Sequence, residues 1–340
     1  MFEALVSWEN LLAAYRKAAA GKRGRADAAA FEHHREENLL ALQDELRAGT
    51  YRPGGYHSFF IHEPKRRLIS AAPFRDRVVH HALCNLIEPL FERSFSADSF
   101  ANRRGKGTHR ALRQCQLLAR RHRYVLQCDV RQFFPSIDHE VLRAQIRRKV
   151  TDLRVLALVD QILATGSGVL SEEYEMVYFP GDDLFAVNRP RGLPIGNLTS
   201  QFWANVYLSP VDHFVKRELR CPGYARYVDD LLLFADDKPR LWRAKRELER
   251  RLERLRLTIH PGAHPRPVTE GIPFLGFVTF PDRRRLKRRK GIAFRRRLER
   301  LRALEAGGEL PAERLRASIA GWVGHVGYGN TVGLRKAVLG

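Results

Sequence analysis

Residues 224–234, Tyr-Ala-Arg-Tyr-Val-Asp-Asp-Leu-Leu-Leu-Phe, constrain this chain more than any other segment. They hold two adjacent carboxylates, Asp229 and Asp230, between an alternating aromatic segment and a wholly apolar one. That pattern predicts a β-hairpin with Val228-Asp229 as its tight turn and a buried outgoing strand. Two carboxylates at the end of a buried strand are costly to ionise together unless a cation lies between them. A solvated turn is the alternative interpretation, and a third carboxylate elsewhere in the chain would argue against it.

A third carboxylate follows a second predicted strand. Residues 124–130, Tyr-Val-Leu-Gln-Cys-Asp-Val, have strand composition, and Asp129 lies at their end, just before an aromatic bend broken by proline. Three carboxylates at strand ends suit two Mg²⁺ ions, because Mg²⁺ prefers hard oxygen ligands and leaves positions for water and phosphate. Two such ions about 3.5–4 Å apart stabilise both the attacking and the leaving oxygen of a phosphoryl displacement. The pattern therefore points to nucleotide polymerisation.

The two segments resemble motifs A and C of reverse transcriptases, with Tyr-Val-Asp-Asp as the signature tetrapeptide. Their order, and the spacing of 100 residues between Asp129 and Asp229, also fit that family. The resemblance implies an RNA-directed DNA polymerase of the α+β class with a right-hand fold, whose palm is an antiparallel sheet backed by helices. The expected divisions are fingers in 1–123 with contributions from 140–190, a palm in 124–280, and a basic helical thumb in 281–340.

The resemblance also implies which residues hold the metal and the nucleotide. The catalytic carboxylates are expected to be Asp129, Asp229 and Asp230, which ligate two Mg²⁺ ions together with the backbone carbonyl of Val130; Mn²⁺ can substitute. The expected nucleotide-binding residues are Lys65, Arg67, Arg75, Phe134, Ile195, Gly196 and Gln201.

The basic members of that set have a physical basis of their own. Lys65 and Arg67 lie in a basic turn that leads into a strand, and Arg75 begins the helix that follows. A triphosphate needs cations beyond its magnesium, and arginine can grip phosphate with two hydrogen bonds. A solvated basic turn is an equal alternative. Phe134, five residues beyond Asp129, matches the aromatic residue that in the family excludes a 2′-hydroxyl.

Residues 191–208 are similar to the fourth block of the family. Most reverse transcriptases carry Gln-Gly where this chain has Ile195-Gly196, and the chain continues with Ser200-Gln201. The form Ile-Gly-x-x-x-Ser-Gln resembles reverse transcriptases of diversity-generating retroelements, in the group II intron-like lineage. We hypothesise that the lost glutamine amide allows mispairs to be extended, notably opposite template adenine. Alternatives are a group II intron-derived or phage-defence enzyme, and a catalytically silent RNA-binding scaffold.

The charge of the chain indicates a polyanionic partner. Lysine plus arginine number 60 against 38 acidic residues, a net charge of +22, and nucleic acid relieves such self-repulsion. Between residues 283 and 302 twelve positions are Lys or Arg, interleaved with apolar residues, which predicts a helix with a basic outer surface. The expected template and primer contacts are Arg103, Lys106, Gly276, Arg288, Arg289, Arg295 and Arg296.

The expected partners are template RNA, primer, cDNA and dNTP, and the resemblance adds a small basic accessory protein encoded by the retroelement. No apolar run approaches the roughly 20 residues of a membrane span, and no amino-terminal signal peptide is present. The four cysteines are scattered, which favours a reducing compartment over a disulfide or zinc site. We therefore expect a cytoplasmic protein of a prokaryote or phage that does not associate with membranes.

The remaining expectations concern secondary structure. Apolar spacing predicts helices over 26–48, 138–163 and 239–257, and a helical pair within 315–339. Residues 177–188 are expected to form a hairpin around Pro-Gly-Asp-Asp, with Asp182 and Asp183 solvated.

Overall fold

A four-stranded antiparallel sheet lies at the centre of the computed structural model, which describes residues 1–62 and 66–340. Across the sheet the order is β4-β5-β3-β6. The strands are β4 (Gly223–Tyr227), β5 (Asp230–Ala235), β3 (Tyr124–Asp129) and β6 (Pro265–Pro267). The predicted hairpin is confirmed, because β4 and β5 pair with Tyr227 opposite Asp230, which leaves Val228-Asp229 as the turn.

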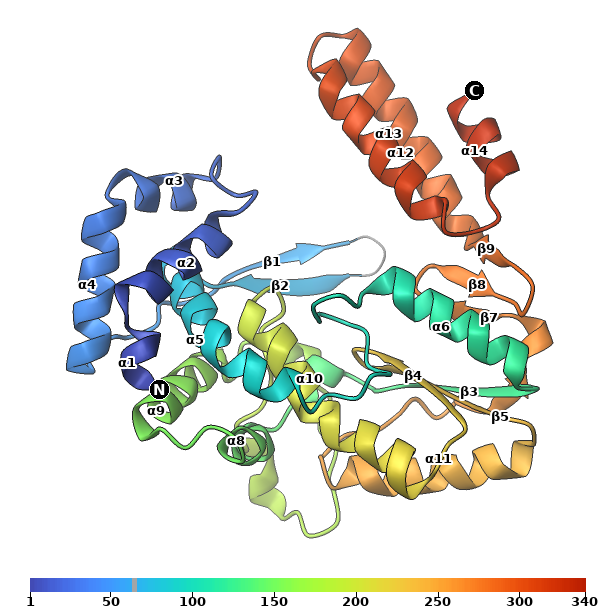
Figure 1. The fold of residues 1–340 in the computed structure, drawn as a ribbon, viewed down its shortest axis with the longest axis horizontal. Coiled ribbons are helices and arrows are strands. Elements are labelled where there is room, and N and C mark those ends of the chain that lie inside the picture. Colours follow the sequence, from blue (N-terminus) through green and yellow to red (C-terminus); the bar gives the residue numbers. More distant parts are fainter. Residues whose placement is uncertain (63–65) are drawn as a thin grey trace.

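Both faces of this sheet are covered by helices, which explains why β5 is apolar throughout. Leu231 and Leu233 belong to the core that includes α11 (Lys238–Glu253), while Leu232 and Phe234 belong to the core that includes α6 (Thr108–Arg121). A strand buried on both sides has no solvent-facing position that would favour a polar residue. The predicted α+β class, with an antiparallel sheet backed by helices, is confirmed (Figure 1).

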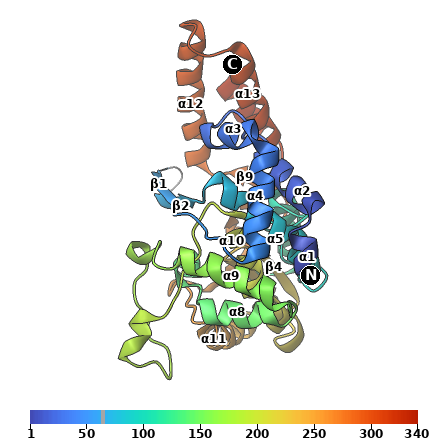
Figure 2. The ribbon, with the colours of Figure 1, turned by 90° about the vertical axis from the view of Figure 1, so that its left-hand side faces the viewer.

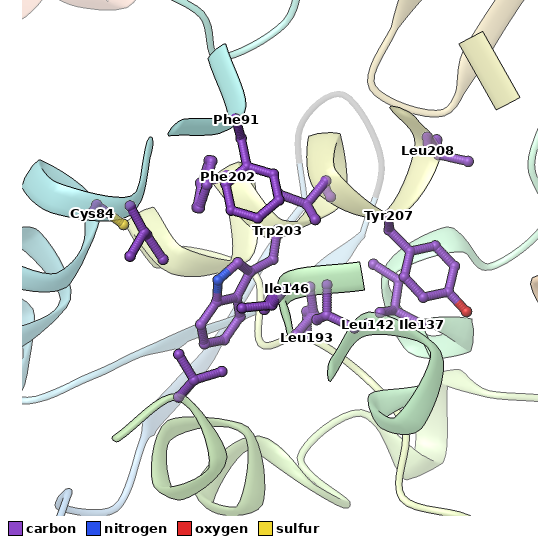
Figure 3. Close-up of a cluster of buried hydrophobic side chains, with 14 of the residues drawn as sticks. Cys84, Phe91, Ile137, Leu142, Ile146, Leu193, Phe202, Trp203, Tyr207 and Leu208 are labelled. Carbon is purple, nitrogen blue, oxygen red and sulfur yellow. The ribbon is translucent and has the colours of Figure 1, made fainter. Parts of the chain in front are cut away.

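A helical layer packs beside the sheet and contains Trp203, the largest of the fully buried side chains among the described residues. It consists of α5 (Phe74–Glu92), α8 (His139–Arg147), α9 (Leu153–Gly166), α10 (Leu198–His213) and the π-helix η3 (Phe214–Glu218). Trp203 of α10 lies among Phe91, Ile146 and Phe202 in this layer (Figure 3). Residues 138–163 are helical as predicted, in two helices: the chain breaks after α8, and Asp152 caps α9 by accepting from the amides of Arg154 and Val155.

The amino-terminal segment adds four helices and a small hairpin. The helices are α1 (Phe2–Leu5), α2 (Trp8–Ala19), α3 (Ala26–His33) and α4 (Arg35–Ala48), and the hairpin is β1 (His57–Ile61) with β2 (Arg67–Ala71). The prediction of one helix over 26–48 is wrong, because His34 leaves the helical region (φ −117°, ψ 45°). Its predicted end is confirmed, since Gly49 adopts the left-handed conformation that closes α4.

The carboxyl-terminal segment begins with a three-stranded sheet and then extends away from the body of the molecule (Figure 1). The sheet contains β7 (Ile272–Phe274), β8 (Phe277–Thr279) and β9 (Arg284–Leu286), followed by α12 (Arg288–Ala306), α13 (Ala312–Val326) and α14 (Val332–Leu339). Phe294 and Trp322 stack with their ring centroids 4.3 Å apart and join α12 to α13. The helical pair predicted within 315–339 is confirmed as α13 and α14.

The segment between α9 and α10 departs from the prediction (Figure 2). Residues 177–188 contain no strand; they form turns and the short 3-10 helix η2 (Leu184–Asn188). Asp182 is not solvated, because Arg189 donates hydrogen bonds to its carboxylate and holds its pKa below the ordinary value. Asp183 accepts from the Phe185 amide and caps η2. In the described part of the chain, no helix has the length and apolar character needed to cross a membrane.

Candidate active site

The register of the central sheet brings the three aspartates to one end of it. Asp129, the last residue of β3, lies directly opposite Asp230, the first residue of β5. Asp229 occupies the adjoining turn, and its carbonyl accepts a hydrogen bond of 3.1 Å from the Val130 amide. Segments 100 residues apart in the sequence are thereby fixed next to each other by main-chain hydrogen bonds.

A glutamine ties the third aspartate to the sheet. Gln127 lies two residues before Asp129, so both side chains emerge on the same face of β3. The Gln127 side-chain amide donates to both carboxylate oxygens of Asp230, at 3.0 and 3.2 Å, and to the Pro273 carbonyl at 3.1 Å. Its own oxygen accepts from Nη2 of Arg266 at 3.0 Å. Gln127 therefore orients Asp230 and links it to an arginine on β6.

Burial and mutual repulsion make Asp229 and Asp230 hard to ionise. Burial, followed by the charge of Asp129, raises the pKa of Asp229 to about 6. Burial also raises the pKa of Asp230 to about 7, with Asp129 and Asp229 adding repulsion and the Gln127 hydrogen bond opposing it. Clustered carboxylates with raised pKa values form a hard-oxygen donor set whose charge a divalent cation would neutralise. Among the described residues, no three His, Cys, Asp or Glu side chains are grouped as ligands of a single ion.

A hollow beside Asp129 and Asp229 contains several of the predicted nucleotide-binding residues. Arg67, Phe134 and Ile195 line it together with Val130. The positive charge of Arg67 favours the ionised form of Asp229 and so lowers its pKa. Both Phe133 and Phe134 border the hollow, but Phe133 is 3 % exposed and belongs to the core, whereas Phe134 is only partly buried. Lys65, predicted to share this role, lies outside the described residues.

The loop before α10 is held tightly against the amino-terminal hairpin. The Ser70 amide donates to the Ile195 carbonyl at 2.8 Å, and the Asn197 side chain donates to the Ser70 carbonyl at 2.8 Å. Gly196 has a φ of +118°, and a Cβ there would lie 2.9 Å from Cγ2 of Ile69. Glycine is therefore required at 196 by backbone conformation and by close packing.

Three of the described residues predicted to bind the nucleotide do not line this hollow: Gly196, Arg75 and Gln201. Arg75 pairs with Glu45, and its guanidinium lies 5.4 Å from the centroid of the Tyr51 ring. These contacts join α5 to α4 and give Arg75 a structural role that requires no nucleotide. Gln201 is exposed on the first turn of α10 and is not among the residues around the hollow.

The two cations predicted to contact template in the 99–109 loop instead bind their own chain. The Arg103 side chain is only 5 % exposed; it donates to the Glu92 carboxylate at 2.7 Å and to the Ser99 carbonyl at 3.0 Å. Lys106 donates to the Ala97 carbonyl at 2.7 Å. The Arg103 side chain is thus held inside the protein, whereas the Lys106 hydrogen bond lies at the exposed surface; the template contacts expected of both residues stay predictions.

The template and primer contacts predicted in the carboxyl-terminal part lie in a tight turn and on the exposed surface of α12. Gly276 follows Leu275 in the two-residue turn between β7 and β8, and both have positive φ values, the pattern of a type I′ turn. Four predicted cations are exposed on α12: Arg288, Arg289, Arg295 and Arg296. This surface can accept a phosphate backbone.

A second hollow adjoins the first and contains residues that the sequence analysis missed. It is lined by Gln127, Arg266 and Lys287 as well as Asp129 and Asp230. The strand alternation of Gln127 with Asp129 was a usable signal for the first of these residues. His260 lines both hollows, and its Nε2 atom lies 3.6 Å from Oδ2 of Asp129. No sequence pattern pointed to His260, because a tertiary bridge between residues 130 and 259 brings it to the site.

The hairpin turn itself is strained and is supported from behind by a buried ion pair. Val228 has a φ of +57°, which is unusual for a β-branched residue and costs on the order of 1–3 kcal/mol. Behind the turn, Nε and Nη2 of Arg226 each lie 2.7 Å from an oxygen of Asp212, and both side chains are fully buried. Ser99 accepts a further hydrogen bond from Nη2 at 2.9 Å.

The sheet, the three carboxylates at its end and the basic hairpin beside them define the right-hand fold of polymerases, as predicted. Residues 61–278 match the family model described as reverse transcriptase (RNA-dependent DNA polymerase). The match covers more than half of the chain, and the chain belongs to the reverse transcriptase family.

The chain is similar to several curated relatives. It is 26% identical over 198 residues to protein YkfC of Escherichia coli (strain K12), covering 55% of this chain and 48% of that protein. It is 26% identical over 183 residues to the group II intron-encoded protein LtrA of Lactococcus lactis subsp. cremoris, covering 53% of this chain and 28% of LtrA. The matched region thus spans less than half the length of each relative.

Solved structures give weaker similarity. Apo telomerase from Candida tropicalis has a TM-score of 0.47 at 9% identity, covering 68% of this chain and 47% of that chain. A partial Cas6-RT-Cas1–Cas2 complex has a TM-score of 0.40 at 15% identity, covering 75% of this chain and 41% of that chain. These scores are too low to support an inference about this chain.

Proposed function

We propose that this protein is an RNA-directed DNA polymerase that makes cDNA by two-metal-ion nucleotidyl transfer. The observation that carries the proposal is the pairing of Asp129 with Asp230, and the adjoining position of Asp229, beside a hollow lined by Arg67 and Phe134. Membership of the reverse transcriptase family supports the same activity.

In this proposal each group around the site has a defined task. Asp129, Asp229, Asp230 and the Val130 carbonyl would hold two Mg²⁺ or Mn²⁺ ions, which when bound supply charge stabilisation for an in-line phosphoryl displacement. The primer 3′-hydroxyl attacks the α-phosphate of the dNTP, and pyrophosphate leaves. Arg67 binds the triphosphate, and Phe134 packs beneath the sugar and disfavours a 2′-hydroxyl.

The nucleic acid would lie between the hairpin β1-β2 and the basic surface of α12. The exposed arginines of α12 grip the phosphate backbone without reading sequence, which suits an enzyme that translocates and makes binding dependent on salt. In this arrangement residues 1–123, with part of 140–190, form the fingers, 124–280 the palm and 281–340 the thumb.

Within the family, we propose the error-prone enzyme of a diversity-generating retroelement. Ile195 lines the nucleotide hollow, where its aliphatic side chain replaces the side-chain amide of a glutamine. Loss of this polar contact supports relaxed selection of the incoming base. The partners in this proposal are a template RNA, its primer and cDNA, and a small basic accessory protein, in the cytoplasm of a prokaryote or phage. Similarity to LtrA favours a second candidate, an enzyme derived from a group II intron.

Primer extension on a defined RNA template with Mg²⁺, followed by sequencing of the products, tests this proposal. We expect cDNA synthesis, with misincorporation concentrated opposite template adenine. Faithful cDNA would retain the polymerase and exclude the diversity-generating subtype. Absence of any product on RNA, with and without a candidate accessory protein, would leave a silent RNA-binding scaffold as the better description.

A further inference from the structure

A pocket on the helical side of the molecule shares no residue with the two hollows around the aspartates. Its walls come from the end of α5, the end of α8, the second half of α10, the π-helix η3 and α11. Apolar groups form much of its surface, with Phe91, Val206, Pro210 and Phe214 among the lining residues. The proposed polymerase chemistry gives this pocket no role.

The rim of this pocket is strongly cationic. Arg148 and Arg217 are exposed there, and Arg251 is half-buried against the Phe214 ring, with its guanidinium carbon 5.5 Å from the ring centroid. None of these three arginines forms an ion pair with a carboxylate among the residues that the structure describes. Lys149 adds a fourth charge, 5.1 Å from the centroid of the Phe91 ring.

Two buried polar atoms in the lining lack partners. Gln145 is 7 % exposed; its amide donates to the Tyr207 carbonyl at 3.3 Å, but its Oε1 atom accepts no hydrogen bond from a described residue. Nε of Arg251 is likewise buried without an acceptor in the described structure. Buried polar atoms of this kind are uncommon in folded proteins, and an acceptor and a donor in one pocket suit a ligand that carries both.

The backbone of the wall is also irregular. Pro210 lies inside α10 and has no N–H to donate to the Val206 carbonyl, and the helix continues as the π-helix η3. Short π-helical segments are rare and frequently occur at functional sites. Here the π-helix carries both Phe214 and Arg217 to the pocket.

We propose that this pocket binds a single unpaired nucleotide, with its base on the Phe214 side and its phosphate on Arg148 and Arg217. An inorganic anion would leave the apolar surface uncovered, and an apolar ligand without a negative charge would leave the arginines without a counter-ion. A nucleoside phosphate supplies a flat apolar base, hydrogen-bonding edges and a negative charge together. The nucleotide can belong to a strand of single-stranded RNA or be free in solution.

Photocrosslinking with a short single-stranded oligouridylate that carries one 4-thiouridine tests this site on the full-length protein. We expect crosslinks to map to residues 206–218 or to the segment around Arg251, in addition to any in the catalytic hollows. Competition with unlabelled oligouridylate and with uridine 5′-monophosphate separates the two sources. Competition by the oligonucleotide alone identifies an RNA strand, and equal competition by the mononucleotide identifies a free nucleotide.

Two double variants with the same charge change provide the matched comparison. Arg148→Gln with Arg217→Gln removes charges at the pocket, and Arg246→Gln with Arg254→Gln removes exposed charges that do not line it. The first pair should weaken oligouridylate binding by about tenfold more than the second and abolish the pocket crosslink, because it removes both contacts assigned to the phosphate. Phe214→Leu should lower affinity without changing its salt dependence.

Equal loss of affinity in both double variants would overturn the proposal, because it would show a diffuse charge effect. Absence of crosslinks at the pocket in the wild-type protein would overturn it as well. Thermal unfolding of each variant verifies that the fold is retained. None of these readouts requires polymerisation, so the outcome is independent of the proposed catalytic activity.

Discussion

Nη1 of Arg226 donates a hydrogen bond of 2.8 Å to the Val228 carbonyl, at the turn that carries Asp229. The same guanidinium is paired with the buried Asp212. The strained turn is therefore anchored by a charged group whose other contacts are fixed inside the protein. This arrangement offsets part of the strain at Val228 and fixes the direction in which Asp229 leaves the sheet.

The first prediction concerns this anchor. Arg226→Ala and Asp212→Ala should each destabilise the protein by about 3–5 kcal/mol, because each leaves an unpaired buried charge. The double variant should lose clearly less than the sum of the two. Urea unfolding of all four proteins measures this coupling. Additive losses would show that the pair is not the anchor that the structure indicates.

A second prediction follows from the raised pKa values of Asp229 and Asp230, about 6 and about 7. The folded protein binds these protons more tightly than the unfolded chain, so without divalent ions its stability should fall as pH rises from about 4 through about 7. Between about pH 5 and about pH 8, the wild-type protein should lose at least about 2 kcal/mol more than the Asp229→Asn/Asp230→Asn variant. Urea unfolding with chelator measures the difference. Identical pH dependence in the two proteins would contradict the account.

A third prediction distinguishes two arginines that the sequence did not separate. Arg67 lines the nucleotide hollow, whereas Arg75 is held by Glu45. Arg67→Gln should raise the KM for dNTP by about ten- to a hundredfold, the effect of losing a hydrogen bond to a charged group. Arg75→Gln is the matched control and should leave KM near the wild-type value. Steady-state primer extension checks both, and equal effects would refute this assignment of roles.

A fourth prediction concerns fidelity. Ile195→Gln would restore an amide beside the incoming nucleotide and should reduce misincorporation opposite template adenine by about fivefold, the effect of one net hydrogen bond of about 1 kcal/mol. Sequencing of cDNA from a defined RNA measures the error rate. Ile195→Leu preserves the aliphatic character and serves as the control. An unchanged rate in Ile195→Gln would refute the proposed source of infidelity.

The central hairpin could be predicted from sequence because its pattern is local. The apolar run after Asp230 indicates a strand that is buried on both faces. The tight turn is predicted by the strand-forming residues on either side of Val228-Asp229. The pairing of Asp129 with Asp230 is not local; strand-end positions and the family resemblance indicated that the three carboxylates act together, but neither gave the alignment of the strands. The structure shows the register of β3 and β5, which places Asp129 directly opposite Asp230.

The cationic residues were harder to predict, because sequence shows the charge and not its partner. Arg103 and Lys106 lie in a glycine-containing basic loop but donate to Glu92 and to the Ala97 carbonyl. The break at His34 also had no signal, since the apolar spacing continues across it. Gln127 was within reach of sequence reasoning, because strand alternation places it on the face of Asp129.

The most direct test of the account is primer extension on RNA by Asp129→Asn, Asp229→Asn and Asp230→Asn, with RNA binding measured in parallel. Asp282→Asn, which alters an exposed carboxylate paired with Arg283, is the control. We predict that each active-site variant loses extension by at least about a thousandfold, since electrostatic stabilisation of the transition state is lost, while RNA affinity changes little. Full extension by Asp129→Asn would contradict the claim that these three carboxylates act together.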